Sequence, residues 1–232
     1  MCGRWTHALI PHLLPLFEQQ FEVIAEESSE YRRVFCERMA DIAIFCEINP
    51  IESGWLFRFV QVVSAQDRVS WMHAVSGRLK ALDGRAKVAT WTRWLRTYWQ
   101  KRNAGVPLPF REAETAELAQ WTLALEPVFE EAVELLCSSP RPEFRNSMIY
   151  YALSETGLAS RKPEATSRLL CFLLRTEGNR PIYDTDKLHN LVRELIASKG
   201  PRFQLLAIVD ELARVGSSEA ARLKNELDQG LG

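Results

Sequence analysis

The residues best suited to chemistry lie in one stretch, residues 91–102, which combines aromatic rings with positive charge. It holds three of the chain's seven tryptophans and four basic residues. At 100° per residue, a helix over this stretch carries on one face Trp91, Trp94, Leu95, Tyr98, Trp99 and Arg102. Arg93 and Arg96 point away from that face. The face either packs inside a helical core or stacks against nucleic-acid bases beside cations that neutralise phosphates.

The first interpretation, a core helix, predicts a buried ion pair. Arg102 lies on the aromatic face one turn after Tyr98, and Glu114 lies on the apolar stripe of the next helix with Leu118 and Trp121. A buried guanidinium without a partner is costly, whereas a carboxylate and stacked rings satisfy it. We therefore predict an Arg102–Glu114 pair that fixes the angle between two helices. We also expect a core position for Trp55, Trp71, Trp91, Trp94, Trp99 and Trp121.

The second interpretation rests on segregated charge. Residues 78–102 hold eight basic side chains against one acid, and residues 111–134 hold seven glutamates against one arginine. Two explanations stay open. Either adjacent helices complement each other, which we favour, or the basic helix faces outward and binds a phosphate backbone. In that second case the nucleic-acid-binding residues would be Arg85, Lys87, Arg93, Arg96 and Lys101.

Other candidate chemistry is weak. Cys2, freed by removal of Met1, could serve as an N-terminal nucleophile. The start is similar to that of abasic-site DNA-crosslinking proteins and glutamine amidotransferases, but the Asn-x-Ala-Pro and Asn-Ala-Arg stretches expected of the crosslinking family are lacking. The histidines have no zinc-ligand spacing, and no glycine-rich phosphate loop is present. We expect no enzyme activity, no metal and no cofactor.

Helices must position these side chains, because the apolar periodicity is helical nearly throughout. Phe35, Met39, Ile42 and Cys46, for example, follow one helix stripe. No alternating strand pattern of useful length occurs. The expected helices span roughly residues 8–24, 29–47, 53–63, 65–82, 85–103, 111–125, 127–138, 145–155, 163–176, 184–199, 202–215 and 217–228. The sequence therefore predicts an all-α fold.

Start and stop signals divide these helices. Ser64 to Asp67 resembles a capping box with Asp in place of Glu, and Pro163 suits a first helical position. In Lys199-Gly200-Pro201, a cation ends one helix, glycine lies just past it, and proline starts the next. Prolines recur about every 20 residues from Pro107 onward, which gives helix pairs near the HEAT repeat length.

This punctuation predicts an array of antiparallel helix pairs, either HEAT-like and solenoid-like or an irregular bundle. The best hinge lies around residues 103–109. It separates an N-terminal helical part, residues 1–103, from a C-terminal helical part, residues 104–232, and the two parts form one continuous helical domain in the simplest interpretation.

Composition places the chain among ordinary globular proteins. It has 232 residues, 47% of them hydrophobic and 25% charged, with a formal net charge of −1. Net charge therefore attracts it to neither nucleic acid nor membranes as a whole. The five cysteines are scattered and form no CxxC pair, which is typical of reduced thiols. No apolar run is long enough for a membrane helix. We expect a cytoplasmic protein with no membrane contact.

A set of residues in fixed order resembles a known bacterial domain. The set begins with Trp55, Phe59 and Arg68, and continues through Tyr98-Trp99-x-x-Arg102-x-x-Gly105-x-Pro107, Glu114, Trp121, Pro127 and Pro163-Glu164-Ala165. It resembles the uncharacterised helical domain at the C-terminal end of bacterial sirtuin-like proteins. The resemblance covers roughly residues 30–228.

The resemblance implies a biological context. Such sirtuin-like proteins are associated with bacterial defence against phage, where the sirtuin-like part consumes NAD and the helical part senses or regulates. This sequence carries no sirtuin-like part, so the NAD-consuming activity does not transfer to it. The implied function is a non-enzymatic protein-interaction and regulatory module, whose partner would be a sirtuin-like effector or a phage protein. The alternative is a nucleic-acid-binding protein that uses the basic aromatic helix 85–102.

Overall fold

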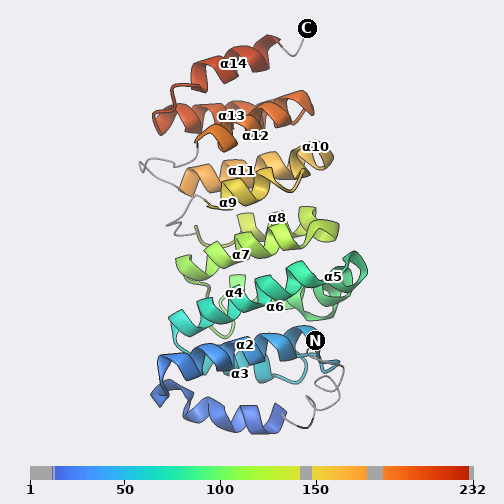
Figure 1. Cartoon of the computed structure of the whole chain (residues 1–232), viewed down its shortest axis with the longest axis vertical. Helices are drawn as coiled ribbons and strands as arrows, with labels where there is room; N and C mark the ends of the chain where they lie inside the picture. The colour runs from blue at the N-terminus through green and yellow to red at the C-terminus, as the bar shows by residue number, and fades with distance from the viewer. Residues whose placement is uncertain (1–11, 13, 142–147, 177–184, 230–232) are drawn as a thin grey trace. The chain divides into compact units, whose positions relative to one another are not determined.

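The computed structural model of this protein describes residues 12, 14–141, 148–176 and 185–229. Within these ranges the chain forms helices joined by turns and short loops, without any strand (Figure 1). The predicted all-α fold is therefore confirmed. Over the same ranges, every helix is too short or too polar to cross a lipid bilayer.

The chain divides into two compact units. The first comprises residues 1–128 with residues 138–140, and the second comprises residues 129–137 with residues 141–232. The predicted division after residue 103 falls inside the first unit. The reason is that α7 (Glu112–Ala124) packs along α4 (Ala65–Ala81) rather than starting a new core.

The first unit is built around α4, which packs against α2 (Ser29–Phe45) on one side and α7 on the other. Arg32 contacts Asp67 and Asp41 contacts Arg78, so α2 and α4 run in the same direction. The remaining elements are residues 14–19, η1 (Gln20–Glu22), η2 (Ile24–Glu26), α3 (Trp55–Val62), α5 (Gly84–Thr90), η3 (Trp91–Leu95), α6 (Arg96–Asn103) and η4 (Glu126–Val128).

The predicted basic aromatic helix is continuous from α5 through η3 to α6, but its middle is a π-helix, Trp91–Leu95. A π segment inserts about one extra residue into a turn, which the apolar spacing alone does not reveal. Asn49 shows one consequence, because its side-chain amide donates to the Arg93 carbonyl at 2.8 Å. The amide thus supplies a donor to a carbonyl of the segment where the regular α-helical ladder is interrupted.

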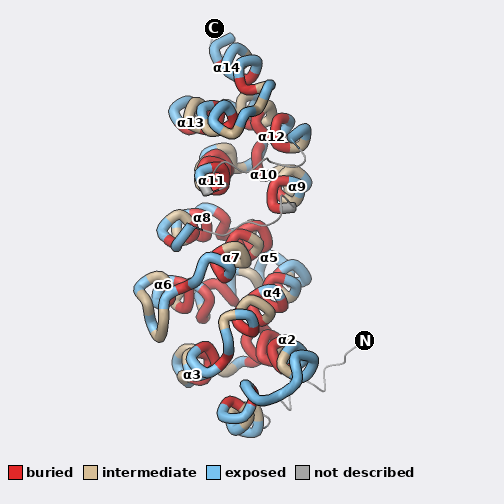
Figure 2. The backbone as a smooth tube through the Cα atoms, turned by 90° about the vertical axis from the view of Figure 1, so that its left-hand side faces the viewer, coloured by how far each residue is buried: buried red, intermediate tan, exposed pale blue. Residues whose placement is uncertain are grey.

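The second unit has a similar layered packing. Here α11 (Pro163–Thr176) packs against α8 (Phe129–Cys137) and α13 (Arg202–Arg214), while α12 (Thr185–Ala197) packs against α9 (Met148–Ser154) and α14 (Ala220–Gln229). The four-residue helix α10 (Leu158–Arg161) was not predicted. In both units the buried residues face neighbouring helices (red in Figure 2). The HEAT-like repeat stays a prediction.

The predicted helix signals are mostly present. Ser64 accepts a hydrogen bond from the Asp67 amide, and α11 begins at Pro163. At Lys199-Gly200-Pro201 the predicted helix break is present, and Pro201 is the N-cap residue of α13. Lys199, predicted to end the helix, lies past the end of α12 at Ala197 and adopts the left-handed conformation, with φ of 55°. Gly200 is closely packed, since a Cβ there would lie 3.0 Å from Ser167 Oγ and would make that neighbour shift.

Candidate functional site: a buried arginine and glutamate cluster

The aromatic face of residues 91–102 lies in the core of the first unit. Its side chains Trp91, Trp94, Tyr98 and Trp99 are at most 1% exposed, and Trp121 of α7 is fully buried with them. Trp71 lies among them, with ring centroids 5.5 Å from Tyr98 and 6.0 Å from Trp121. The core prediction is confirmed. No ring of this face can stack on a nucleic-acid base in this structure.

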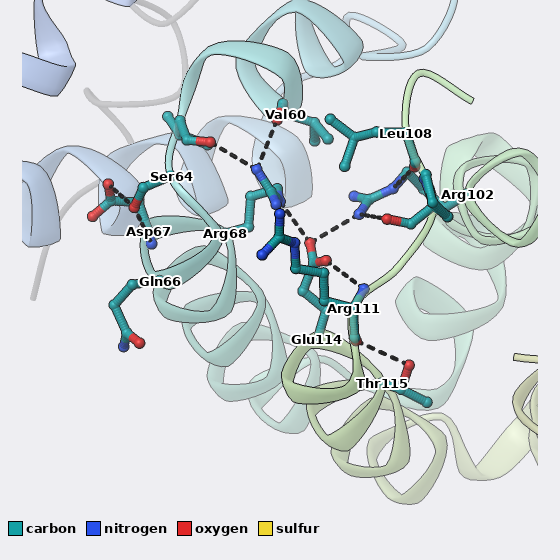
Figure 3. Close-up of polar contacts among 12 residues, drawn as sticks. Val60, Ser64, Gln66, Asp67, Arg68, Arg102, Leu108, Arg111, Glu114 and Thr115 are labelled. Atoms are coloured by element: carbon teal, nitrogen blue, oxygen red, sulfur yellow. Dashed lines mark hydrogen bonds and ion pairs between the residues drawn. The ribbon is translucent and has the colours of Figure 1, made fainter. Parts of the chain in front are cut away.

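Glu114, in the first turn of α7, joins three parts of the first unit. One carboxylate oxygen accepts hydrogen bonds from Arg68 Nε and Arg102 Nη2, each at 2.8 Å. The other oxygen accepts from the Arg111 amide at 2.8 Å, which caps α7. Figure 3 shows the two guanidinium groups converging on this carboxylate. The predicted Arg102–Glu114 pair is confirmed, with both side chains fully buried.

Arg102 fastens the connection between α6 and α7. Its Nε donates to the Leu108 carbonyl at 2.9 Å, and its Nη1 donates to the Tyr98 hydroxyl at 2.6 Å. The guanidinium also lies 4.3 Å from the ring centroid of Phe110. This guanidinium therefore has a carboxylate, a phenol, a carbonyl and an aromatic face as partners, which together offset the cost of removing it from water.

Arg68 of α4 is named in the family resemblance, but its pairing with Glu114 was not predicted from the sequence. Its Nη1 donates to the carbonyls of Val60 and Val63 at the C-terminal end of α3, at 3.3 and 2.7 Å. That end of a helix carries partial negative charge, so it favours a cation. The signal was available, because Arg68 lies on the same α4 face as Trp71 and Val75 and therefore points inward.

The cluster holds two cations and one anion, so its interior charge is positive. Carbonyl oxygens at the end of α3 and in the loop before α7 balance the excess. Burial raises the pKa of the Tyr98 phenol to about 12, against the opposing effect of the Arg102 guanidinium. Tyr98 therefore stays neutral at physiological pH and serves as a hydrogen-bond partner for Arg102. The cluster therefore holds α3, α4, α6 and α7 in position relative to one another.

The five proposed nucleic-acid-binding residues have different environments. Arg93 donates to the carbonyls of Ala43, Ile44 and Cys46 at distances from 2.7 to 3.1 Å. It therefore covers the C-terminal end of α2. Lys101 lies 5.4 Å from the Phe57 ring centroid. Arg85 and Arg96 are exposed and Lys87 is half-buried.

The other candidate groups give no reactive site in the described residues. Cys2 lies outside those residues. Burial raises the pKa of Cys36 to about 12 and that of Cys137 to about 11, so both thiols are protonated at neutral pH. In the described part of the chain, no three His, Cys, Asp or Glu side chains are grouped so that they could hold a metal ion.

A family model covers most of the residues that build this site. The model described as "Domain of unknown function (DUF4020)" matches residues 42–208. The chain belongs to this family. The matched range of the DUF4020 family includes Arg68, Arg102 and Glu114 and the whole π segment. No curated protein and no solved structure matches the chain.

Proposed function

We propose that this chain is a non-enzymatic α-helical protein-interaction and regulatory module. The observation that carries the proposal is that its most distinctive side chains are used internally. The tryptophans and the Arg68–Glu114–Arg102 cluster are buried, and they hold α3, α4, α6 and α7 at set angles. A frame held in this way keeps its exposed helix faces in constant geometry, which lowers the entropy cost of binding a partner.

The more specific proposal is the sensing part of a bacterial phage-defence system, which acts in the cytoplasm through a sirtuin-like effector or a phage protein. It is supported by the resemblance of Tyr98, Trp99, Arg102, Glu114 and Trp121, in order, to the C-terminal domain of sirtuin-like proteins. Binding would act by shifting the partner between inactive and NAD-consuming states.

The test combines the purified chain with a bacterial sirtuin-like protein that lacks a helical C-terminal part. We expect a complex in size-exclusion chromatography and a change of about tenfold in the rate of NAD consumption, equivalent to a coupling free energy of about 1.4 kcal/mol. A Glu114→Ala variant, whose frame is loosened, should show less coupling. The absence of a complex together with an unchanged rate would contradict the sirtuin-like partner.

A second candidate function, nucleic-acid binding, is favoured by one observation. Arg85 and Arg96 are exposed and Lys87 is half-buried on the continuous helix of α5, η3 and α6. The test is fluorescence anisotropy with labelled DNA and RNA, single-stranded and duplex, at about 50 and 200 mM NaCl. Salt-sensitive binding that is lost in Arg85→Glu/Arg96→Glu would support this function. Equal binding by that variant would contradict it.

A further inference from the structure

We propose that the N-terminal end of the first unit binds a cationic amphipathic helix of a partner protein. The inference rests on the proposed function and names a surface and partner class for it. The surface, called here the acidic–apolar surface, is formed by Glu22, Val23, Glu26, Glu27, Glu30, Tyr31 and Val34. These residues lie in the segment of η1 and η2 and in the first turns of α2.

The charge of this surface is mainly acidic. Residues 14–31 contain five glutamates and neither lysine nor arginine. Glu18 pairs with Arg58 of α3. The other four, Glu22, Glu26, Glu27 and Glu30, are exposed, and none of their carboxylates forms an ion pair within the described ranges. The neighbouring arginines are used elsewhere: Arg32 pairs with Asp67 and donates to the Glu27 backbone carbonyl, and Arg33 pairs with Glu37. Their negative potential is therefore available to a cationic partner.

Apolar side chains are interleaved with these carboxylates. Val23, Tyr31 and Val34 are 43%, 42% and 40% exposed. On α2, Tyr31 and Glu30 precede Val34 by three and four residues, so these three share one helix face. Glu27 lies in extended backbone just before α2. Most of the segment leading into α2 is exposed (pale blue in Figure 2).

The apolar part of the surface has a rigid base. The Tyr31 ring stacks on Phe35 with centroids 6.5 Å apart and planes 19° apart. Phe35 is buried and contacts Phe17, Phe21 and Phe59. One face of Tyr31 is therefore held by the core while the ring remains partly exposed. A preorganised aromatic side chain of this kind is typical of residues that contribute strongly to interfaces.

Charge complementarity selects the occupant. A helix with leucines on one face and lysines or arginines beside them would place apolar residues on Tyr31 and Val34 and cations near the glutamates. Stabilisation of α2 by its own acids accounts for only one of them, because Glu30 alone lies in the first turn of α2. Glu22 and Glu26 lie in the one-turn helices η1 and η2, and Glu27 lies in extended backbone between η2 and α2.

The experiment uses the full chain and three labelled peptides of about 18 residues, long enough to form a helix. The first peptide carries leucines on one face of a helix and lysines on the other. The second has serine in place of each leucine, and the third has glutamate in place of each lysine. Fluorescence anisotropy at about 50 mM NaCl should show the Lys/Leu peptide binding at least about tenfold more tightly than the other two. Tyr31→Ser/Val34→Ser should remove that margin, and Glu26→Lys/Glu27→Lys should abolish binding.

The matched control, Glu112→Lys/Asp210→Lys, makes the same change in net charge elsewhere and should bind as the unsubstituted chain does. Equal affinity for all three peptides, or equal loss in the control, would overturn the proposal. Sedimentation of the chain alone tests the other occupant. A dimer that dissociates in Tyr31→Ser/Val34→Ser would assign the surface to a second copy instead. The peptide-binding and sedimentation results do not determine the outcome of the NAD-consumption assay. A surface that binds no peptide can therefore be distinguished from a proposed function that is wrong.

Discussion

Single residues in this protein hold elements that are far apart in the sequence. The Glu114 carboxylate contacts Arg68 and Arg102, which lie 46 and 12 positions away. Arg68 in turn reaches the end of α3, so one side chain of α7 indirectly fixes four helices. The cost of burying these charges is offset only while every partner is present.

Replacement of Glu114 should therefore destabilise the first unit strongly. We expect Glu114→Ala to lower the free energy of unfolding by about 3–5 kcal/mol, because two buried guanidinium groups lose their carboxylate. Urea unfolding followed by tryptophan fluorescence measures the change. Glu112→Ala, an exposed position in the same turn, should cost less than about 1 kcal/mol. Equal effects of the two substitutions would show that the cluster does not stabilise the fold.

Two glycines should respond to alanine with opposite signs. A Cβ at Gly200 would lie 3.0 Å from Ser167 Oγ and 3.2 Å from the Leu195 carbonyl oxygen, so Gly200→Ala should destabilise by about 1–3 kcal/mol. Gly77, within α4, has open space around it, and Gly77→Ala should stabilise by about 0.5–1 kcal/mol. Thermal unfolding followed by circular dichroism tests both variants. A change in stability of the same sign in both would contradict this description of the packing.

At the scale of helices, arginines from one helix repeatedly bind the carbonyl end of another. Arg93 covers the end of α2, and Arg68 covers the end of α3. Arg214, likewise, donates to the Leu174 carbonyl near the end of α11. Each contact supplies donors to carbonyls that have no partner within their own helix. Arginine suits this use because its guanidinium carries several donors in a fixed plane.

Removal of the Arg93 side chain tests this structural role. We expect Arg93→Ala to destabilise the first unit by about 1.5–3 kcal/mol, because carbonyls of Ala43, Ile44 and Cys46 lose a charged donor. Arg85→Ala, an exposed position on the same helix, should change stability by less than about 0.5 kcal/mol. Urea unfolding measures both. An Arg93→Ala variant with an unchanged free energy of unfolding would mean that water replaces the guanidinium without cost.

The contact between α12 and the turn before α14 should depend on pH. His189 is buried, and its Nε2 lies 2.9 Å from Ser217 Oγ. Burial lowers the pKa of His189 below its usual value; the Glu219 carboxylate opposes this effect and the Arg193 guanidinium adds to it. Because the folded state favours neutral His189, its contribution is complete above the unfolded pKa and is lost as pH falls towards the folded pKa. Between pH 7.5 and 5.5, the melting temperature of the second unit should therefore fall more in the unsubstituted chain than in the His189→Gln variant. Equal decreases in the two proteins would contradict this.

At the scale of the whole molecule, the two units differ in the side chains that fill their cores. All six tryptophans of the described residues lie in the first unit, where they are buried together with Tyr98. The core of the second unit is mainly aliphatic, with leucines such as Leu169, Leu188 and Leu212 buried between its helices. Partly exposed ion pairs also link these helices, including Lys162–Glu130, Arg175–Glu211, Lys187–Glu155 and Arg193–Glu219. Exposed pairs are individually weak and are screened by salt.

This difference predicts two transitions with unequal salt sensitivity. Tryptophan fluorescence reports only the first unit, whereas circular dichroism reports both. Raising NaCl from about 50 mM to about 1 M should lower the circular-dichroism transition of the second unit by a few degrees and leave the fluorescence transition nearly unchanged. Coincident transitions with equal salt dependence would indicate that the chain unfolds as one cooperative unit.

The sequence by itself determined the helices and which of their faces are inward. Apolar spacing, helix caps and prolines are local signals, and they predicted most helix boundaries as well as the burial of Trp91, Trp94, Tyr98 and Trp99. The Arg102–Glu114 pair could also be predicted, because both residues lie on inward faces of consecutive helices joined by a short turn.

Only the tertiary structure decided which distant elements meet. Arg68 joins Glu114 because α4 packs along α7, and Arg93 meets the end of α2 across more than 40 positions of sequence. Gly200 is fixed by the approach of Ser167 rather than by its own backbone angle. Helical periodicity specifies the direction of a side chain relative to its own axis. The partner it meets depends on the packing of other helices, which local spacing does not encode.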